Sequence, residues 1–140
     1  MKKYKIGLFP MVGDLLHVGH ILALQEAKAH CDKLIVAINT HPEGKCPVQT
    51  VRERVLQAAA VMYVDQVIVY QGRADMDVIA ATLDYDVRFV GDDYRHKEWD
   101  GKAQEEARGI DPYFIDRSHG LSSTELKQRV VMSQTAKERI

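Results

Sequence analysis

The stretch Asp14-Leu15-Leu16-His17-Val18-Gly19-His20 decides the fold, because it joins an apolar segment at 4–9 to an amphipathic one at 21–29. The change from a strand-like to a helix-like pattern indicates a strand-to-helix junction. His17 and His20 are three residues apart, so they share one face of the first helical turn. Free N–H groups and the positive end of the helix dipole favour an anion there. The stretch therefore predicts a phosphate site.

Gly19 supports this interpretation, since a residue without a side chain leaves room for a ligand to approach the backbone. Two other interpretations of the histidine pair remain open. The rings could make ordinary structural hydrogen bonds, or they could bind a metal, for which the sequence offers no third ligand nearby. The position directly after a strand, with Asp14 just upstream, favours phosphate chemistry.

The same two patterns alternate along the rest of the chain. Strand-like segments lie at 5–9, 33–38, 66–70, 87–90 and 112–115, and helix-like segments at 18–29, 50–62, 75–83, 102–107 and 122–132. This alternation predicts an α/β fold, a Rossmann-like doubly wound parallel sheet of about five strands with helices on both faces. We expect a single domain over residues 1–132 and a C-terminal tail at 133–140 that is frayed or docked late.

Composition narrows the classes of function. The chain has 140 residues, 46% hydrophobic and 28% charged, with a net charge of −1. That balance argues against general binding of nucleic acid, which needs a basic surface. No apolar run reaches the roughly 18 residues of a membrane span, and no signal peptide is apparent. Cys31 and Cys46 form no CxxC pair, so we expect reduced thiols and a cytoplasmic location.

A second constellation follows about a hundred residues after the first, at Arg117-Ser118-His119-Gly120-Leu121-Ser122-Ser123-Thr124-Glu125. A capping box explains Ser122 and Glu125 by itself. It does not explain three consecutive hydroxyl residues with an arginine upstream, which together describe another anion cradle at a helix N-terminus. Ligands of doubly wound sheets bind beyond the carboxyl ends of the strands. We therefore expect the two cradles to meet.

Together these motifs resemble the nucleotidylyltransferase superfamily, with its HxGH signature at 17–20 and its S-[ST]-T signature at 122–124. Within it, the chain resembles the cytidylyltransferases, the glycerol-3-phosphate cytidylyltransferases in particular. The further matches are Arg52-Glu53-Arg54 followed by Tyr63-Val64-Asp65-Gln66-Val67-Ile68, Gly91-Asp92-Asp93, and the second constellation. The resemblance covers about residues 3–131. It departs at 11–14, where the family has Gly-Thr-Phe-Asp and only the aspartate is kept.

The resemblance implies transfer of a cytidylyl group from CTP to a small alcohol phosphate, with glycerol 3-phosphate as the first candidate. Pyrophosphate would leave and a CDP-alcohol would form. It also implies Mg²⁺ or another divalent cation, and a homodimer. One alternative is an adenylyltransferase that uses ATP on a phosphorylated vitamin or sugar, because Ser-Ser-Thr is also common among adenylyltransferases. Another is a non-catalytic nucleotide-binding module.

The resemblance also implies the residues of the site. Catalytic roles fall to His17, His20, Lys45 and Arg117. Nucleotide contacts are expected from Met11, Val12, Asp14, Gly19, Arg54, Gly91, Asp92, Asp93, Ser118, Gly120, Leu121, Ser122, Ser123 and Thr124. No side chain is expected to bind the metal directly, with Asp14 as the one candidate.

Several of these residues also have an ordinary structural interpretation. Lys45 lies in the long loop 39–49 and fits a solvated surface lysine, whereas the resemblance gives it contact with the nucleotide phosphates. Arg54 fits a surface i,i+4 partner. Asp92 and Asp93 fit a turn that ends a strand. Trp99 fits either the core or a cover over a ligand, and the sequence does not decide.

Overall fold

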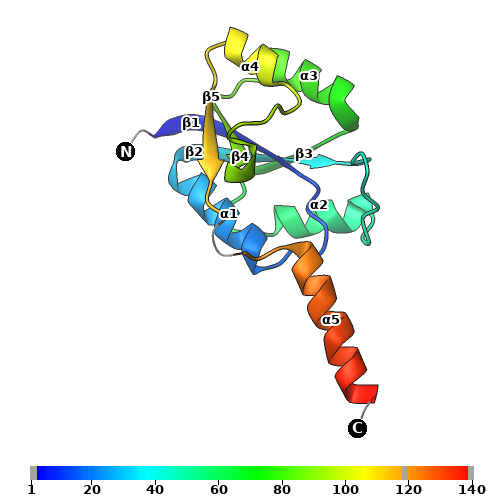
Figure 1. Cartoon of the computed structure of the whole chain (residues 1–140). Coiled ribbons are helices and arrows are strands. Elements are labelled where there is room, and N and C mark those ends of the chain that lie inside the picture. Colours follow the sequence, from blue (N-terminus) through cyan, green and yellow to red (C-terminus); the bar gives the residue numbers. More distant parts are fainter. Residues whose placement is uncertain (1–2, 118–119, 139–140) are drawn as a thin grey trace.

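The computed structural model describes residues 3–117 and 120–138, and it forms one parallel sheet covered by helices (Figure 1). The strands are β1 (Tyr4–Met11), β2 (Cys31–Asn39), β3 (Gln66–Tyr70), β4 (Val87–Gly91) and β5 (Asp111–Ile115). The helices are α1 (Val18–Ala29), α2 (Val51–Ala59), α3 (Gly72–Thr82), the 3₁₀ turn η1 (Asp92–Tyr94), α4 (Lys102–Ala107) and α5 (Ser123–Glu138). The strand order is β3-β2-β1-β4-β5, and every pairing is parallel. The predicted Rossmann-like α/β fold is confirmed.

Two separate hydrophobic layers explain why helices cover both faces. On one face, Leu24 of α1 and Ala58 of α2 pack with strand residues such as Phe89. On the other face, Met76 of α3 packs with Leu8 and its neighbours in β2. The strands are apolar on both sides because both sides are buried, which is typical of parallel sheets.

The strand order creates a crevice at the carboxyl ends of β1 and β4. From β1 the chain proceeds to β2 and β3 on one side, and then crosses to β4 and β5 on the other side. The segments that leave these two neighbouring strands therefore diverge, and ligands of doubly wound sheets bind at such a point. The 14–20 stretch leaves β1 here, and η1 leaves β4.

Three helix boundaries differ from the sequence prediction. Helix α2 ends at Ala59 instead of near Met62, because Val61 and Val64 close a turn that returns the chain to β3. Helix α3 begins at Gly72, and the Asp75 carboxylate in its first turn accepts a hydrogen bond from the Gln71 N–H. The helix predicted to end at 132 continues to Glu138 as α5, which extends away from the sheet (Figure 1).

None of the helices in the described part of the chain is long and apolar enough to cross a membrane. Both cysteines are free thiols, Cys31 buried and Cys46 exposed. Burial raises the pKa of Cys31 to about 11, so this thiol stays protonated.

Candidate active site

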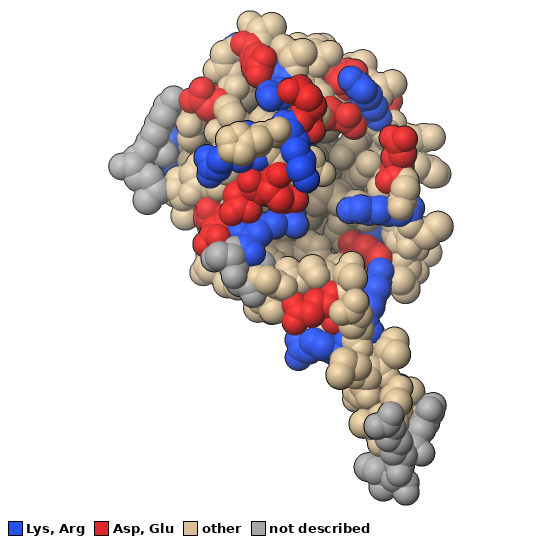
Figure 2. Space-filling view, in the orientation of Figure 1, with Lys and Arg blue, Asp and Glu red and all other residues tan. Residues whose placement is uncertain are grey.

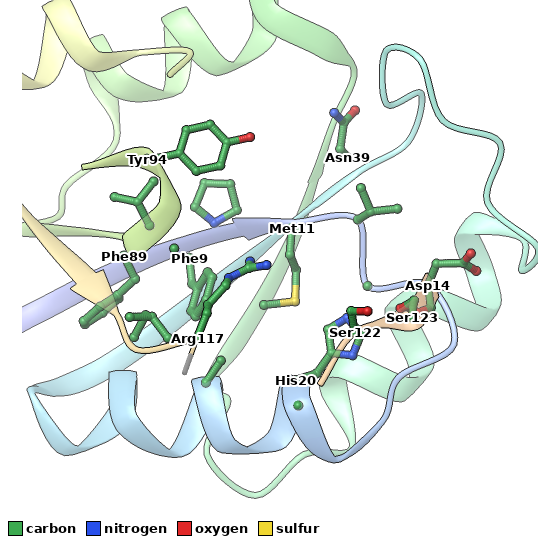
Figure 3. Close-up of a pocket in the computed structure, with 18 of the residues that line it drawn as sticks. Phe9, Met11, Asp14, His20, Asn39, Phe89, Tyr94, Arg117, Ser122 and Ser123 are labelled. Atoms are coloured by element: carbon green, nitrogen blue, oxygen red, sulfur yellow. The ribbon is translucent and has the colours of Figure 1, made fainter. Parts of the chain in front are cut away.

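A cavity of about 800 Å³ opens in the crevice, and both predicted cradles line it (Figure 3). The hydroxyl of Ser123, at the start of α5, donates a 3.1 Å hydrogen bond to the carbonyl of Asp14 after β1. The two coil-to-helix junctions are therefore in direct contact. The predicted site residues that line the cavity are Met11, Val12, Asp14, His17, Gly19, His20, Lys45, Gly91, Arg117, Leu121, Ser122, Ser123 and Thr124.

The two histidines cap their own helix. The Nδ1 of His17 accepts from the Gly19 N–H at 3.0 Å, and the Nδ1 of His20 accepts from the His17 N–H at 3.2 Å. Each neutral ring therefore carries its proton on Nε2, because Nδ1 acts as an acceptor. The ring centroids are 4.3 Å apart. Two imidazole N–H donors are thus fixed side by side on one helical turn.

Burial sets the charge of His20. It lowers the pKa of His20 to about 4, with a further contribution from the positive charges of His17 and Arg117, and Asp14 opposes the shift. At neutral pH His20 is consequently uncharged and donates one hydrogen bond through Nε2. A phosphate oxygen is a suitable acceptor for such a donor.

Gly19 is needed for the junction itself. A Cβ at this position would lie 2.7 Å from Cε1 of His17 and 3.1 Å from the Cβ of Leu121. The space beside Gly19, which we expected a ligand to occupy, is therefore partly filled by the His17 ring and by the segment before α5. Any larger residue would separate the two junctions or displace the ring.

Asp14 connects the junction to the long loop and to α5. Its carboxylate accepts 3.0 Å hydrogen bonds from the N–H groups of Val48 and Gln49, and Lys127 lies 3.5 Å away. Burial works to raise the pKa of Asp14, but these N–H groups and Lys127 lower it below its ordinary value. Both carboxylate oxygens already accept hydrogen bonds. Among the described residues no group of three His, Cys, Asp or Glu side chains forms a metal-binding cluster.

Arg54 lies outside the cavity lining and is only 2% exposed. Its guanidinium donates to the carbonyls of Val12 at 2.9 Å, Asn39 at 2.7 Å, Thr40 at 3.3 Å and Gln49 at 3.3 Å. It therefore holds the ends of β1 and β2 and the base of the long loop. Its contact with a nucleotide stays a prediction, whereas its role as a buried anchor is visible.

Of the predicted residues Gly91, Asp92 and Asp93 at the end of β4, only Gly91 lines the cavity. A Cβ on Gly91 would contact Asp93 and lie 2.6 Å from Nε of Arg117, so a glycine lets the arginine approach the strand end. Asp93 pairs with Arg117 at 3.7 Å. Asp92, Asp93 and Gly120 do not line the cavity. The predicted contact of Ser118 lies outside the described residues.

Several lining residues were not predicted as site residues from the sequence. They include Asn39, Tyr70, Arg88, Tyr94, Trp99 and Lys127. Asn39 and Tyr70 end their strands, so the carboxyl-edge rule already pointed to them. Arg88 carried a clearer signal, since a charged residue within an otherwise buried strand needs a partner or a ligand. Trp99, left undecided above, lines the cavity and donates to Glu105 at 3.0 Å.

The surface around this face carries charges of both signs. Figure 2 shows lysine and arginine side chains interspersed with aspartate and glutamate, and no broad patch of one sign. Recognition of an anion here therefore depends on a few placed donors, because the long-range field is weak.

Comparison with known proteins agrees with this geometry. The model of the cytidylyltransferase-like family matches residues 12–129. The bifunctional protein HldE of Hyphomonas neptunium is 33% identical over 139 residues, which is 95% of this chain and 28% of that protein. HldE of Nitrobacter hamburgensis is 33% identical over 132 residues, 89% of this chain and 27% of that protein. The chain thus spans little more than a quarter of these relatives.

Solved structures share the fold. The lipopolysaccharide core biosynthesis protein of Thermoplasma volcanium aligns with a TM-score of 0.68 and 23% identity, over 81% of this chain and 97% of that one. A pantothenate synthetase of Thermus thermophilus aligns with a TM-score of 0.51 and 16% identity, over 87% and 61%. The family match covers both cradles and everything between them, and the chain therefore belongs to the cytidylyltransferase-like family of nucleotidyltransferases.

Proposed function

We propose that the chain transfers a nucleotidyl group from a nucleoside triphosphate to the phosphate of a small alcohol or sugar, with release of pyrophosphate. The observation that carries this proposal is the contact between the two helix N-termini at one cavity. A triphosphate is long enough to engage both anion cradles at once, whereas a single phosphate would need only one.

The attacking group needs no catalytic base. The second pKa of a phosphate monoester is near 6, so the acceptor is largely a dianion at neutral pH. Its oxygen attacks the α-phosphorus, and the bond to the β-phosphate breaks to release pyrophosphate. The main obstacle is electrostatic, because two anions approach each other and charge moves to the leaving group. The reaction needs no covalent enzyme intermediate, because the acceptor phosphate attacks the α-phosphorus directly.

Hydrogen-bond donors and cationic groups of the chain stabilise this negative charge. The Nε2–H groups of His17 and His20 donate to the α-phosphate and to the bridging oxygen as charge develops there. The hydroxyls of residues 122–124 and the N–H groups of α5 hold the β- and γ-phosphates. Arg117 and Lys45, which both line the cavity, balance the negative charge. Positioning and electrostatic stabilisation then account for the reaction.

Mg²⁺ is proposed as a companion of the triphosphate. Both oxygens of Asp14 accept hydrogen bonds, and the described residues present no carboxylate cluster, so the chain offers no ready ligand set. A cation would be held by phosphate oxygens and water, as Mg²⁺ commonly is. None of the steps above depends on it.

Two nucleotides are candidates. The resemblance of the motifs favours CTP, with glycerol 3-phosphate as the first acceptor and a CDP-alcohol as product. The similarity to the HldE proteins favours the second candidate, transfer of an adenylyl group from ATP to a phosphorylated sugar. Homodimerisation is likewise a proposal, for which light scattering after gel filtration is the test.

The decisive experiment measures pyrophosphate release with CTP and ATP in turn, each with glycerol 3-phosphate or a sugar phosphate. We expect release with one nucleotide, and none from a His17→Ala/His20→Ala variant. His96→Ala, an exposed histidine outside the cavity lining, is the matched control. Tight binding of CTP or ATP without release, whatever the acceptor, would contradict catalysis and support a nucleotide-binding module.

A further inference from the structure

The turn between β1 and α1 contains an unusual backbone conformation. Leu15 is the only residue other than glycine with a positive φ in the described ranges 3–117 and 120–138, at +47°. A side chain disfavours this left-handed region, because its Cβ comes too close to the following carbonyl oxygen. Gly13 is also left-handed, at +70°, but glycine adopts the conformation at little cost. Leu15 therefore needs a contact from outside the turn to hold it there.

The side chain of Gln49 makes that contact. Its Oε1 accepts a 2.7 Å hydrogen bond from the Leu15 N–H, across 34 residues of sequence. This distance is at the short end of the range for an N–H donor and a carbonyl oxygen. The bond fixes the plane of the peptide between Asp14 and Leu15, which restricts the φ of Leu15.

Gln49 projects from a rigid base. Its N–H donates to Oδ1 of Asp14 at 3.0 Å, and its carbonyl accepts from Nε of Arg54 at 3.3 Å. The next residue, Thr50, caps α2. Gln49 is half-buried, whereas residues 43–46 at the tip of the same loop are exposed. The acceptor for Leu15 is consequently held in place independently of the loop tip.

Leu15 determines how the chain enters α1. Only Leu16 separates it from His17, the N-cap residue of the helix. A change at Leu15 to the right-handed or extended region would rotate its φ by roughly 100° or more and redirect the His17 side chain. His17 lines the cavity and Gln49 does not, so the Gln49 side chain acts on the reaction indirectly, through this turn.

We propose that Gln49 is a positioning residue of the candidate active site. Its side-chain oxygen keeps Leu15 left-handed, and that conformation directs the His17 ring into the cavity beside His20. The kinetic part of this inference rests on the proposed function, because it requires that His17 stabilises the transition state. The structural part, which is the orientation of the ring, does not.

The test removes the hydrogen bond and then the need for it. Gln49→Leu has a similar shape but no acceptor, so most molecules should lose the left-handed conformation at Leu15. We expect kcat to fall about tenfold, which is the order of the preference of a leucine against that conformation. Adding Leu15→Gly should restore kcat to within about threefold of the wild type, because glycine adopts a positive φ without help. The KM for the nucleotide should change much less, since α5 and Arg117 are unaltered.

Two control variants separate positioning from general stability. Leu15→Gly by itself should retain the wild-type kcat, because Leu15 does not line the cavity. Val48→Ala changes a neighbouring residue whose side chain is 67% exposed and whose N–H still bonds to Asp14, so it should change neither kcat nor KM. A merely structural role of Gln49 predicts no rescue, because Leu15→Gly removes packing and supplies no new contact.

A measurement without turnover tests the structural part. Long-range ¹H–¹⁵N NMR spectra, recorded about two pH units above the ordinary histidine pKa of about 6.5, show which ring nitrogen carries the proton. In the wild type the proton of His17 should lie on Nε2, since Nδ1 accepts from the Gly19 N–H. Gln49→Leu should populate both tautomers of His17, and the double variant should restore the single one.

Absence of rescue by Leu15→Gly in either measurement, or wild-type values for Gln49→Leu, overturns the role of Gln49. If Gln49→Leu does not fold, recovery of the fold in the double variant supports that role, and continued unfolding overturns it. No pyrophosphate release by the wild type with CTP or ATP overturns the proposed function, and the NMR spectra then decide the role of Gln49 by themselves.

Discussion

His17 and His20 show how backbone groups prepare a side chain for chemistry. One main-chain N–H donates to Nδ1 of each ring, which leaves the proton of a neutral ring on Nε2. The result is a pair of Nε2–H donors, of which His20 is uncharged at neutral pH because it is too buried to ionise there. A preorganised donor stabilises the charge that develops on the bonded oxygen, which is the condition of the proposed transition state.

The histidine substitutions follow from this arrangement. His17→Ala or His20→Ala should each lower kcat by about 10²–10³, as expected for loss of one preorganised donor. The nucleotide KM should change much less, because α5 and Arg117 still hold the distal phosphates. Steady-state pyrophosphate assays measure both constants, with His96→Ala as control. A kcat for His20→Ala within twofold of the wild type would refute the role given to the ring.

The buried state of His20 also makes stability depend on pH. Its pKa is about 4 in the folded chain against 6.5 for an ordinary histidine, so between these values only the unfolded chain takes up the proton. The free energy of unfolding should therefore decrease as pH falls from about 6.5 to 4, by at most about 1.4 kcal/mol per pH unit. Urea unfolding across this range should show the slope in the wild type and a shallower one in His20→Ala. Identical slopes would contradict the assignment.

The connections between elements rest on single buried polar residues. Arg54 joins β1, β2 and α2 through four carbonyls, and Asp14 joins β1, the long loop and α5. Loops that carry functional groups need such anchors, because their own packing is sparse. Lys45, which lines the cavity, lies on the loop whose base Asp14 and Arg54 hold.

Replacing the anchor should therefore affect stability and binding together. Arg54→Lys keeps the charge but loses the planar fork, so several buried carbonyls lose their donors and the free energy of unfolding should fall by about 2–4 kcal/mol. The nucleotide KM should rise as the Lys45 loop loosens. Chemical denaturation and kinetics measure the two effects. Arg52→Lys, an exposed neighbour on the same helix, should change neither, and an unaltered Arg54→Lys protein would exclude the anchor role.

Elements were predicted well where local patterns specify them, and less well where tertiary contacts do. The predicted helix at 50–62 begins with a Thr50–Glu53 capping box, a pattern local to the sequence, in which Thr50 accepts from the Glu53 N–H. The end of α2, by contrast, depends on the turn at Val61 and Val64, which no local helix-stop pattern predicted. Arg54 resembled a ligand-binding residue, yet its four carbonyl partners come from distant segments, so only the structure could reveal them.

Across the molecule, two segments about a hundred residues apart come together because both follow strands that end at the same edge of the sheet. That general rule predicted the meeting of the cradles. It could not predict the buried contacts of Glu105 with Arg88 and Trp99, since these three residues meet only through the packing of α4 against the sheet.

A ligand that bridges both cradles should stabilise the entire fold. If the triphosphate engages both, saturating CTP or ATP at about a hundred times its Kd should add about 2.7 kcal/mol and raise Tm by several degrees. The corresponding monophosphate lacks the groups that α5 would hold, and it should stabilise far less at the same concentration. Differential scanning calorimetry measures both. Equal increases in Tm for the monophosphate and the triphosphate would argue against binding of the distal phosphates by α5.

The hydrogen bond from the Gly19 N–H to the His17 ring has a consequence for the population of active molecules. The same contact closes the first turn of α1 and orients the imidazole of His17. When that turn opens, the sheet stays folded but the His17 ring loses its orientation, and the molecule is inactive. The rate at which the Gly19 amide exchanges with deuterium would then report the fraction of molecules in this inactive state, in a sample that remains globally folded.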